Sequence, residues 1–310
     1  MKKIASIDIG SNTVRLLIIE VDESLNFRVL ASRRVITRLG EGMDTYGKLL
    51  DARMSETFSA LSKFRQDCRD HGNPPLRAVA TSAVREASNG KQFVRLALQK
   101  TGIKIEIIPW EEEARLTLEG VFWKIPHENR KSLIIDIGGG STEFILSEGK
   151  DIASFCSSSL GVVRLTEKYI HQHPVLNTEY ENLTTYLREE LKTVQKKLSA
   201  FLPQVLIGTA GTVTTLAALN GNIYPYDPEK IHGTLLSRKE IETLSLNLKA
   251  KSLNERLALK ALEPGREDLI IAGTAIVLET MRIFQCDPLQ VSEYSLREGI
   301  ILKAVGATAS

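Results

Sequence analysis

The strongest constraint on the fold is a short motif that the chain contains twice. The tetrapeptide Ile-Asp-Ile-Gly occupies residues 7–10 and again residues 135–138. In each copy an apolar run leads into the aspartate and a second apolar run follows the glycine turn, which predicts a strand, a turn and a strand. Because the two copies lie in different halves of a 310-residue chain, they indicate a duplicated domain rather than a short-period repeat.

The second copy has the side chains expected at a phosphate site. Three consecutive glycines, 138–140, remove every Cβ from the turn, so that backbone N–H groups can cradle an anion. Ser141 and Thr142 add hydroxyl donors, and Asp136 and Glu143 place two carboxylates beside the turn. A carboxylate next to a phosphate requires a cation between them, which points to Mg²⁺. The alternative is a plain β-hairpin, although three glycines cost more backbone entropy than a hairpin turn requires.

Two further turns extend this pattern. In the first copy Gly10 is followed by the polar residues 11–13, so a phosphate chain is expected to bind in a cleft between the two halves. The third turn, residues 208–215, is rich in glycine and threonine and leads into a helix, whose first N–H groups favour anions. A helix start that uses glycine for close packing is the alternative at this third turn.

One arginine and a run of three glutamates are further candidates for the same site. Arg85 follows a predicted strand at 76–80, which is a usual place for ligands in an α/β sheet, but an ordinary helix-surface arginine fits the sequence too. The glutamates at 111–113 open a predicted helix, where acids suit the helix dipole. This helix joins the two halves, so one of these glutamates is also a candidate to face a substrate.

Composition excludes several classes of protein. The chain is 43% hydrophobic and 25% charged, which is ordinary for a globular protein, and its net charge of +2 does not indicate a general nucleic-acid binder. Cys68, Cys156 and Cys286 are widely spaced, which favours reduced thiols in a cytoplasmic protein over a disulfide framework or a zinc site. No apolar run approaches the length of about 20 residues that spans a membrane. His171 and His173 are expected to be surface residues.

The apolar patterns predict an α/β order of elements in both halves. The expected strands are 3–9, 13–21, 27–36, 76–80, 103–108, 132–137, 142–146, 152–157, 205–207 and 290–291. The expected helices are 54–68, 92–100, 110–122, 163–171, a helical region at 174–200, 238–251, 268–284 and 296–305. Residues 22–26 are expected to form a turn, and residues 37–44 a glycine-containing loop. Each half should contain a mixed five-stranded sheet.

Taken together, the motifs resemble those of the Ppx/GppA family of exopolyphosphatases and guanosine pentaphosphate phosphohydrolases, a branch of the actin and sugar-kinase superfamily. The resemblance covers residues 4 to about 304 and rests on these motifs in this order: DIGSNTVRLLI (8–18), RLGEGMD (38–44), ATSAVREASNG (80–90), EEEARLTLEGV (111–121), DIGGGSTEF (136–144), SLGVVRLTE (159–167), GTAGTVTTLAAL (208–219), HG (232–233), PGREDLIIAG (264–273) and YSLREGIIL (294–302). It implies a duplicated actin-like (ASKHA, ribonuclease H-like) α/β fold with an interdomain cleft. The implied domains are 1–124 with 296–310, and 125–295.

The resemblance also implies roles for individual residues. Glu113 corresponds to the acid that polarises the attacking water, and Asp136 and Glu143 to acids that organise the water and a divalent cation such as Mg²⁺, with Asp8 as a further metal ligand. The implied phosphate-binding residues are Gly10, Ser11, Asn12, Thr13, Arg15, Arg85, Gly138, Gly139, Gly140, Ser141, Thr142, Gly208, Thr209, Gly211, Thr212 and Arg266. Arg266, with Arg33, Arg34 and Arg38, is expected to lie outside the cleft and hold the rest of a long substrate.

The implied activity is hydrolysis of terminal phosphate from inorganic polyphosphate, with guanosine pentaphosphate as a second candidate substrate. The alternatives are an ATP-dependent small-molecule kinase and a nucleotide-sensing actin-like protein. Larger family members add a C-terminal HD-type helical domain, and this chain ends after the last motif, so the short form is expected. A homodimer in the cytoplasm is expected, without a DNA or membrane partner.

Overall fold

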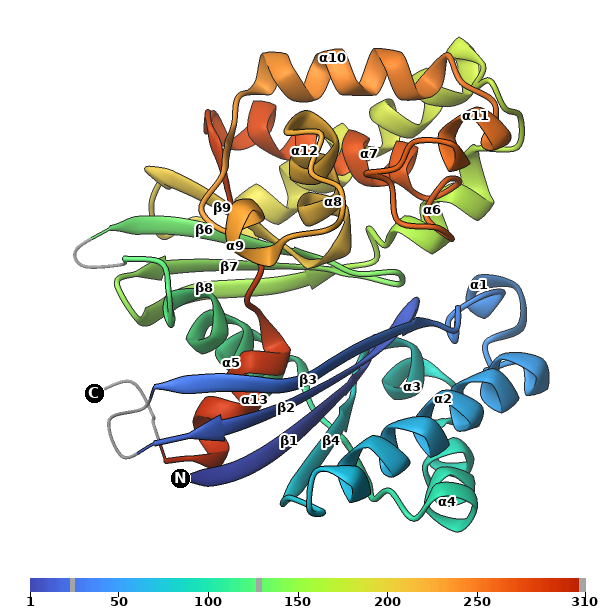
Figure 1. Ribbon diagram of the computed structural model, residues 1–310. Coiled ribbons are helices and arrows are strands. Elements are labelled where there is room, and N and C mark those ends of the chain that lie inside the picture. Colours follow the sequence, from blue (N-terminus) through green and yellow to red (C-terminus); the bar gives the residue numbers. More distant parts are fainter. Residues whose placement is uncertain (23–25, 127–129, 307–310) are drawn as a thin grey trace. The chain divides into compact units, whose positions relative to one another are not determined.

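The computed structural model describes residues 1–22, 26–126 and 130–306 (Figure 1). The predicted turn at 22–26 therefore lies largely outside the described residues. The chain forms two compact units. Unit 1 comprises Met1–Gly120 and the C-terminal segment from Leu296, and unit 2 comprises Val121–Ser295. The domain limits at 124 and 295 stay a proposal.

Unit 1 is built on a five-stranded mixed sheet with the order β3-β2-β1-β4-β5. Its strands are β1 (Lys2–Ile9), β2 (Thr13–Val21), β3 (Phe27–Ile36), β4 (Leu76–Ala80) and β5 (Ile105–Ile107). The first three strands form an antiparallel meander, and β4 and β5 add in parallel to β1. Parallel pairing requires a crossover, and helices between the later strands provide it.

Helices cover both faces of this sheet. They are α1 (Met43–Tyr46), α2 (Asp51–Asp70), α3 (Ser82–Glu86), α4 (Gly90–Thr101), α5 (Trp110–Phe122) and α13 (Leu296–Ala304). Ile7 and Ile9 of β1 pack in one core with residues of α2 and α4, whereas Ile4 packs on the opposite face with Ile301 of α13. This alternation follows from the two-residue period of a strand. The prediction that the final helix packs on the first half is confirmed.

Unit 2 repeats this topology and adds one strand. Its strands are β6 (Lys131–Ile137), β7 (Thr142–Glu148), β8 (Asp151–Ser158), β9 (Val205–Thr209), β10 (Leu235–Leu236) and β11 (Leu289–Val291). The sheet order is β10-β11-β9-β6-β7-β8, so β8-β7-β6-β9-β11 matches the order in unit 1. The prediction of five strands is wrong for this half, because β10 is a two-residue strand, too short to produce an alternating pattern.

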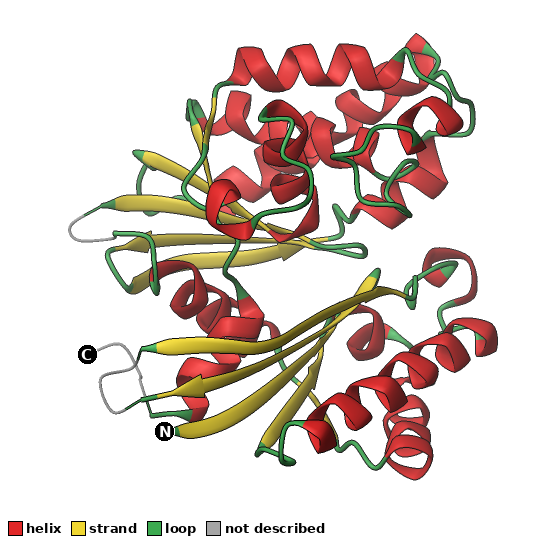
Figure 2. Cartoon of the chain, in the orientation of Figure 1, coloured by secondary structure: helices red, strands yellow, loops and turns green. Residues whose placement is uncertain are grey.

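The helices of unit 2 surround one central apolar helix (Figures 1 and 2). They are α6 (Val162–Tyr169), α7 (Asn177–Lys197), α8 (Ala210–Asn220), α9 (Pro228–Ile231), α10 (Arg238–Lys249), α11 (Leu253–Leu257) and α12 (Ile270–Phe284). Helix α12 is buried over most of its length and contacts α6, α7, α8 and α10. A helix that is apolar on all sides is expected at the centre of a helical layer.

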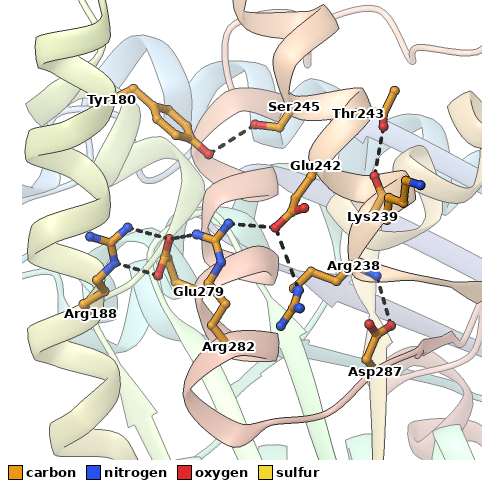
Figure 3. Close-up of polar contacts among 10 residues, drawn as sticks. All are labelled: Tyr180, Arg188, Arg238, Lys239, Glu242, Thr243, Ser245, Glu279, Arg282 and Asp287. Carbon is orange, nitrogen blue, oxygen red and sulfur yellow. Dashed lines mark hydrogen bonds and ion pairs between the residues drawn. The ribbon is translucent and has the colours of Figure 1, made fainter.

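A network of charges fixes α12 to its neighbours (Figure 3). Glu279 of α12 is buried, with 1% of its side chain exposed, and it pairs with Arg188 of α7 at 2.9 Å and with Arg282 at 2.5 Å. Arg282 in turn pairs with Glu242 of α10 at 2.8 Å. Two arginines offset the cost of burying one carboxylate, so this network ties together three helices.

Within the described residues, none of the helices is long and apolar enough to cross a membrane.

Candidate active site

Both predicted glycine turns close with the same hydrogen bond. The Gly10 N–H donates to the Thr13 carbonyl at 3.0 Å, and the Gly138 N–H donates to the Ser141 carbonyl at 2.9 Å. Ser11, Asn12 and Thr13 are buried in unit 1, as is Ser141 in unit 2. The duplication seen in the sequence therefore extends to the backbone of the two turns.

Each turn is held by a segment that follows the strand meander. In unit 1 the Gly40 N–H donates to the Ser11 carbonyl at 2.7 Å, and a Cβ at Gly40 would lie 2.9 Å from the Ser11 Cβ. In unit 2 the Val163 N–H donates to the Gly139 carbonyl at 2.9 Å, and a Cβ at Gly161 would lie 2.2 Å from that oxygen. Gly40 and Gly161 are thus required for rigid turns. Sequence reasoning gave them no role, although a glycine-containing segment after each meander was a signal.

The strand pairing places different charges beside the two aspartates. Asp8 lies opposite Arg15 on β2, whereas the equivalent Asp136 lies opposite Glu143 on β7. Directly opposite residues have Cβ atoms about 5 Å apart. Burial raises the pKa of the Asp8 carboxyl, and the charges of Arg15 and Arg297 oppose this rise. Unit 1 therefore supplies its own cations, whereas unit 2 has a second carboxylate at the matching position.

Hydroxyl groups organise the carboxylate of unit 2. Glu143 is buried, and its Oε1 accepts hydrogen bonds from Ser141 Oγ at 2.7 Å and from Ser157 Oγ at 3.0 Å. Thr142 Oγ1 donates to the Leu160 carbonyl at 2.6 Å. The hydroxyl protons of Ser141 and Thr142, which the sequence suggested as donors to an anion, are therefore donated within the protein.

Arg85 and Glu113 meet in unit 1, although they come from α3 and α5. Arg85 Nη1 lies 2.7 Å from Glu113 Oε2 and also donates to the Ile108 carbonyl at 3.0 Å. The guanidinium lies 5.2 Å from the ring centroid of Trp110, a cation–π distance. Arg85 Nε and Nη2 are buried without a hydrogen-bond partner in the described part of the chain. These two atoms share one edge of the guanidinium, which matches two oxygens of a phosphoryl group.

The three glutamates of α5 have three different surroundings. Glu111 is exposed, which agrees with a role limited to the helix dipole. Glu112 is half-buried; burial would raise its pKa, but hydrogen bonds from Lys303, Arg115 and Arg77 outweigh burial and lower the pKa to about 2. Glu113 is buried, with 7% of the residue exposed, beside Arg85. Only Glu113 is joined to another predicted site residue in the contacts that the structure describes.

The third turn packs tightly against an arginine. A Cβ at Gly211 would lie 2.0 Å from Arg266 Nη2, so the guanidinium rests on the start of α8. Arg266 is buried and pairs with Glu263 through Nε. Gly208 is also constrained, because its Cβ would lie 2.9 Å from a methyl group of Val213. At this turn the glycines allow close packing, as the alternative reading expected. The turn also lies against Arg266, another of the predicted ligand residues.

Two threonines of this turn have structural contacts. Thr209 Oγ1 donates to the Tyr294 carbonyl at 3.2 Å, and the Thr212 side chain fills the space where Gly273 of α12 lacks a Cβ. Ala210, between them, has a φ of 68°, a left-handed conformation that costs energy for a residue with a Cβ. Strain of this kind often occurs where a backbone is shaped for a ligand.

The arginines expected to hold the outer part of a substrate do not form one group. Arg266 is buried rather than exposed, because it packs on Gly211 and pairs with Glu263. Arg33 is exposed and lies 3.4 Å from Asp67. Arg34 of β3 lies opposite Arg15 of β2, which in turn lies opposite Asp8 of β1. The three charged residues therefore lie side by side on neighbouring strands. Arg38 has a left-handed φ of 49° in the segment that holds the first turn.

The residues present fit a magnesium ion with few protein ligands. In the ranges that the structure describes, no three or more His, Cys, Asp or Glu side chains cluster to hold a metal by themselves. Asp136 and Glu143 are nevertheless opposite each other across β6 and β7. Mg²⁺ is commonly held by one or two carboxylates together with phosphate oxygens of the substrate. Oxygen ligands of this type and number suit Mg²⁺ rather than zinc.

Comparison with known proteins assigns the family. The Ppx/GppA phosphatase family model matches residues 17–307. The chain belongs to this family. It is 31% identical to exopolyphosphatase 2 of Mycobacterium tuberculosis, with 99% of each chain covered. As a member of a phosphatase family with such relatives, the protein is a hydrolase.

Solved structures agree with this assignment. An exopolyphosphatase from Cytophaga hutchinsonii is 30% identical and has a TM-score of 0.92, with 99% of each chain covered. The Aquifex aeolicus member of the Ppx/GppA family is 32% identical, with a TM-score of 0.83 over 100% of this chain and 99% of that one. Together with the strand order that both sheets share, these matches confirm the predicted duplicated α/β fold.

Proposed function

We propose that the protein is an exopolyphosphatase, which hydrolyses the terminal phosphoanhydride bond of inorganic polyphosphate and releases orthophosphate. The observation that carries this proposal is the pair formed by Arg85 and Glu113. A buried guanidinium edge, Nε and Nη2, without an acceptor among the described residues lies beside a buried carboxylate. An anion and a water molecule are the two reactants that such a pair would bind. The similarity to exopolyphosphatase 2 supports the choice of substrate.

The roles of the two side chains follow from the chemistry. Hydrolysis of a phosphoanhydride requires neutralisation of the phosphoryl oxygens and a water molecule in line with the bond that breaks. The free edge of Arg85 would bind two oxygens of the terminal phosphoryl group. The carboxylate of Glu113 would orient the water and accept its proton, and the ion pair with Arg85 fixes the position of that carboxylate. No covalent intermediate is needed.

The remaining predicted residues would bind the phosphate chain and a metal. The turns at residues 10–13 and 138–142 would contribute backbone N–H groups to phosphoryl oxygens. Asp136 and Glu143 would hold Mg²⁺, which supplies charge neutralisation when bound. Asp8 is a weaker candidate ligand than Asp136, because Arg15 already lies opposite it.

The deciding experiment compares substrates with the purified protein. Phosphate release is measured with polyphosphate and with guanosine pentaphosphate, each with Mg²⁺ and with EDTA in its place. We expect phosphate to be released from polyphosphate. We expect EDTA to abolish this release and added Mg²⁺ to restore it. Faster release from guanosine pentaphosphate would favour that second candidate. Phosphate transfer from ATP to an added acceptor, without hydrolysis of either substrate, would instead favour a kinase.

A further inference from the structure

Arg256 of α11 is a buried cation with an unusual set of partners. It is the largest fully buried side chain among the described residues, with an exposed fraction of 0%. Its Nε and Nη2 donate to the Lys251 carbonyl at 3.2 and 3.0 Å, its Nη1 donates to the Glu267 carbonyl, and its Nη2 lies 2.7 Å from His173 Nδ1. A buried charge is costly unless its hydrogen bonds are satisfied. Arg256 thus fixes three separate segments at once.

One of these segments carries Arg266. Residues 263–268 lie in the connection between α11 and α12. Arg256 holds this segment through the carbonyl of Glu267, the residue next to Arg266. Within the segment the Gly265 N–H donates to Glu267 Oε2 at 2.7 Å, and Arg266 pairs with Glu263. The Arg266 guanidinium rests on Gly211 at the third turn. Arg256 therefore fixes the backbone from which Arg266 reaches that turn.

The contact with His173 requires a neutral imidazole. The expectation that His173 is a surface residue is wrong, because it is half-buried and bonded to Arg256, whereas His171 is exposed. A guanidinium has no acceptor, so Nδ1 must accept the hydrogen bond and the proton must be on Nε2. Burial and the charge of Arg256 lower the pKa of His173 from 6.5, and the charges of Asp268 and Glu179 oppose this shift. Protonation would place two cations in contact.

We propose that Arg256 is a positioning residue for phosphate binding, which fixes Arg266 beside the third turn, and that this arrangement requires neutral His173. The proposal rests on the proposed function, since it assigns Arg266 a contact with the phosphate chain. The pKa of His173 is lower in the folded protein than its unfolded value of 6.5. Below about pH 6.5 the unfolded chain therefore binds a proton more readily, and the arrangement of Arg256, His173 and Arg266 loses stability as the pH falls. Residues 263–268 then loosen, and binding of the phosphate chain weakens.

The test is the pH dependence of KM and kcat for polyphosphate in the wild type and in His173→Asn. Asparagine can present an acceptor oxygen near the position of Nδ1 and cannot be protonated. Between about pH 7.5 and about pH 5.5, the wild-type KM is expected to rise up to about tenfold relative to the variant, with little change in the ratio of kcat values. His171→Asn, at the exposed histidine two residues away, should behave as the wild type.

A second readout separates this inference from the proposed function. Hydrogen exchange of residues 263–268 is compared between the wild type and His173→Asn at both pH values. If exchange is faster in the wild type than in the variant at the lower pH but not at the higher pH, the positioning role is supported, even if polyphosphate is not hydrolysed. Absence of hydrolysis by the wild type at every pH would refute the proposed function. Identical exchange, or an identical pH dependence of KM, in the two proteins would overturn the role of Arg256 and His173.

Discussion

Three adjacent glutamates of α5 show how surroundings separate chemically identical side chains. Glu111 is in solvent, Glu112 is held by three cations and Glu113 is buried against Arg85. A carboxylate whose pKa is about 2 is a poor proton acceptor, so Glu112 is a structural residue that joins α5 to α13 and β4. Glu113 is the remaining buried candidate of the three for contact with a water molecule.

Glu112→Gln should destabilise the protein at neutral pH by about 1–2 kcal/mol, after allowance for solvent screening. The pKa of Glu112 is lower in the folded state, so its contribution is present above the unfolded value of 4.5 and is lost as the pH falls towards about 2. Urea denaturation of both proteins, at neutral pH and at steps below about pH 4.5, measures this difference. If the difference in unfolding free energy between the wild type and Glu112→Gln did not become smaller at acidic pH, the ion-pair role would be contradicted. Glu111→Gln is the matched control.

The proposed binding of a phosphoryl group by Arg85 depends on the shape of its guanidinium as well as on its charge. Arg85→Lys keeps the positive charge but cannot present two parallel N–H groups to a phosphoryl group. Loss of one charge-assisted hydrogen bond, at about 1.5–3 kcal/mol, should lower kcat/KM for polyphosphate by about 10- to 100-fold. Arg95→Lys, at an exposed position on α4, serves as the control. An unchanged kcat/KM in Arg85→Lys would show that this edge does not bind substrate.

At the scale of elements, close contact between two helices places Glu113. A Cβ at Gly299 of α13 would lie 1.8 Å from the Leu116 carbonyl of α5, so only glycine allows this approach. Gly299→Ala should force the helices apart and destabilise the protein by about 1–3 kcal/mol. Gly221→Ala, at the end of α8, meets no backbone atom closer than 3.4 Å and should be nearly neutral. Thermal unfolding of both variants tests this; equal melting temperatures would contradict the packing argument.

The sequence predicted the long elements well and the contacts between them poorly. Runs of apolar and β-branched residues bounded by polar turn residues placed β2 and β3 at the observed limits. The short elements were missed, since too few residues carry a period; they are α1, α3, α9, α11 and β10. The approach of Gly161 to the second turn, and the ion pair between Arg85 and Glu113, depend on the sheet order, which propensity and periodicity do not contain.

At the scale of the whole molecule, duplication has produced two sheets with the same order but different charges. The acid and arginine of unit 1 and the two acids of unit 2 occupy equivalent strand positions. This asymmetry favours Asp136 and Glu143 of unit 2 for the proposed metal, because in unit 1 the matching aspartate lies opposite Arg15.

The burial of the proposed site predicts where a polymer is cut. Arg85 and Glu113 have only 16% and 9% of their side chains exposed, so a free chain end reaches them more easily than an internal phosphate does. We expect single phosphates to be released from the ends of long polyphosphate. A gel time course decides this, because early accumulation of chains of intermediate length would mean internal cleavage.

The role of Glu113 as the group that accepts the proton of water is tested most directly by the rate of phosphate release from polyphosphate in Glu113→Gln, with Glu111→Gln as the control. Glutamine keeps the shape of the side chain but cannot accept a proton from water. We expect Glu113→Gln to fold, still to bind polyphosphate and to lose turnover by a factor of about 10² to 10⁴. The control should retain the wild-type rate. A wild-type rate in Glu113→Gln would show that the buried carboxylate beside Arg85 has no part in the reaction.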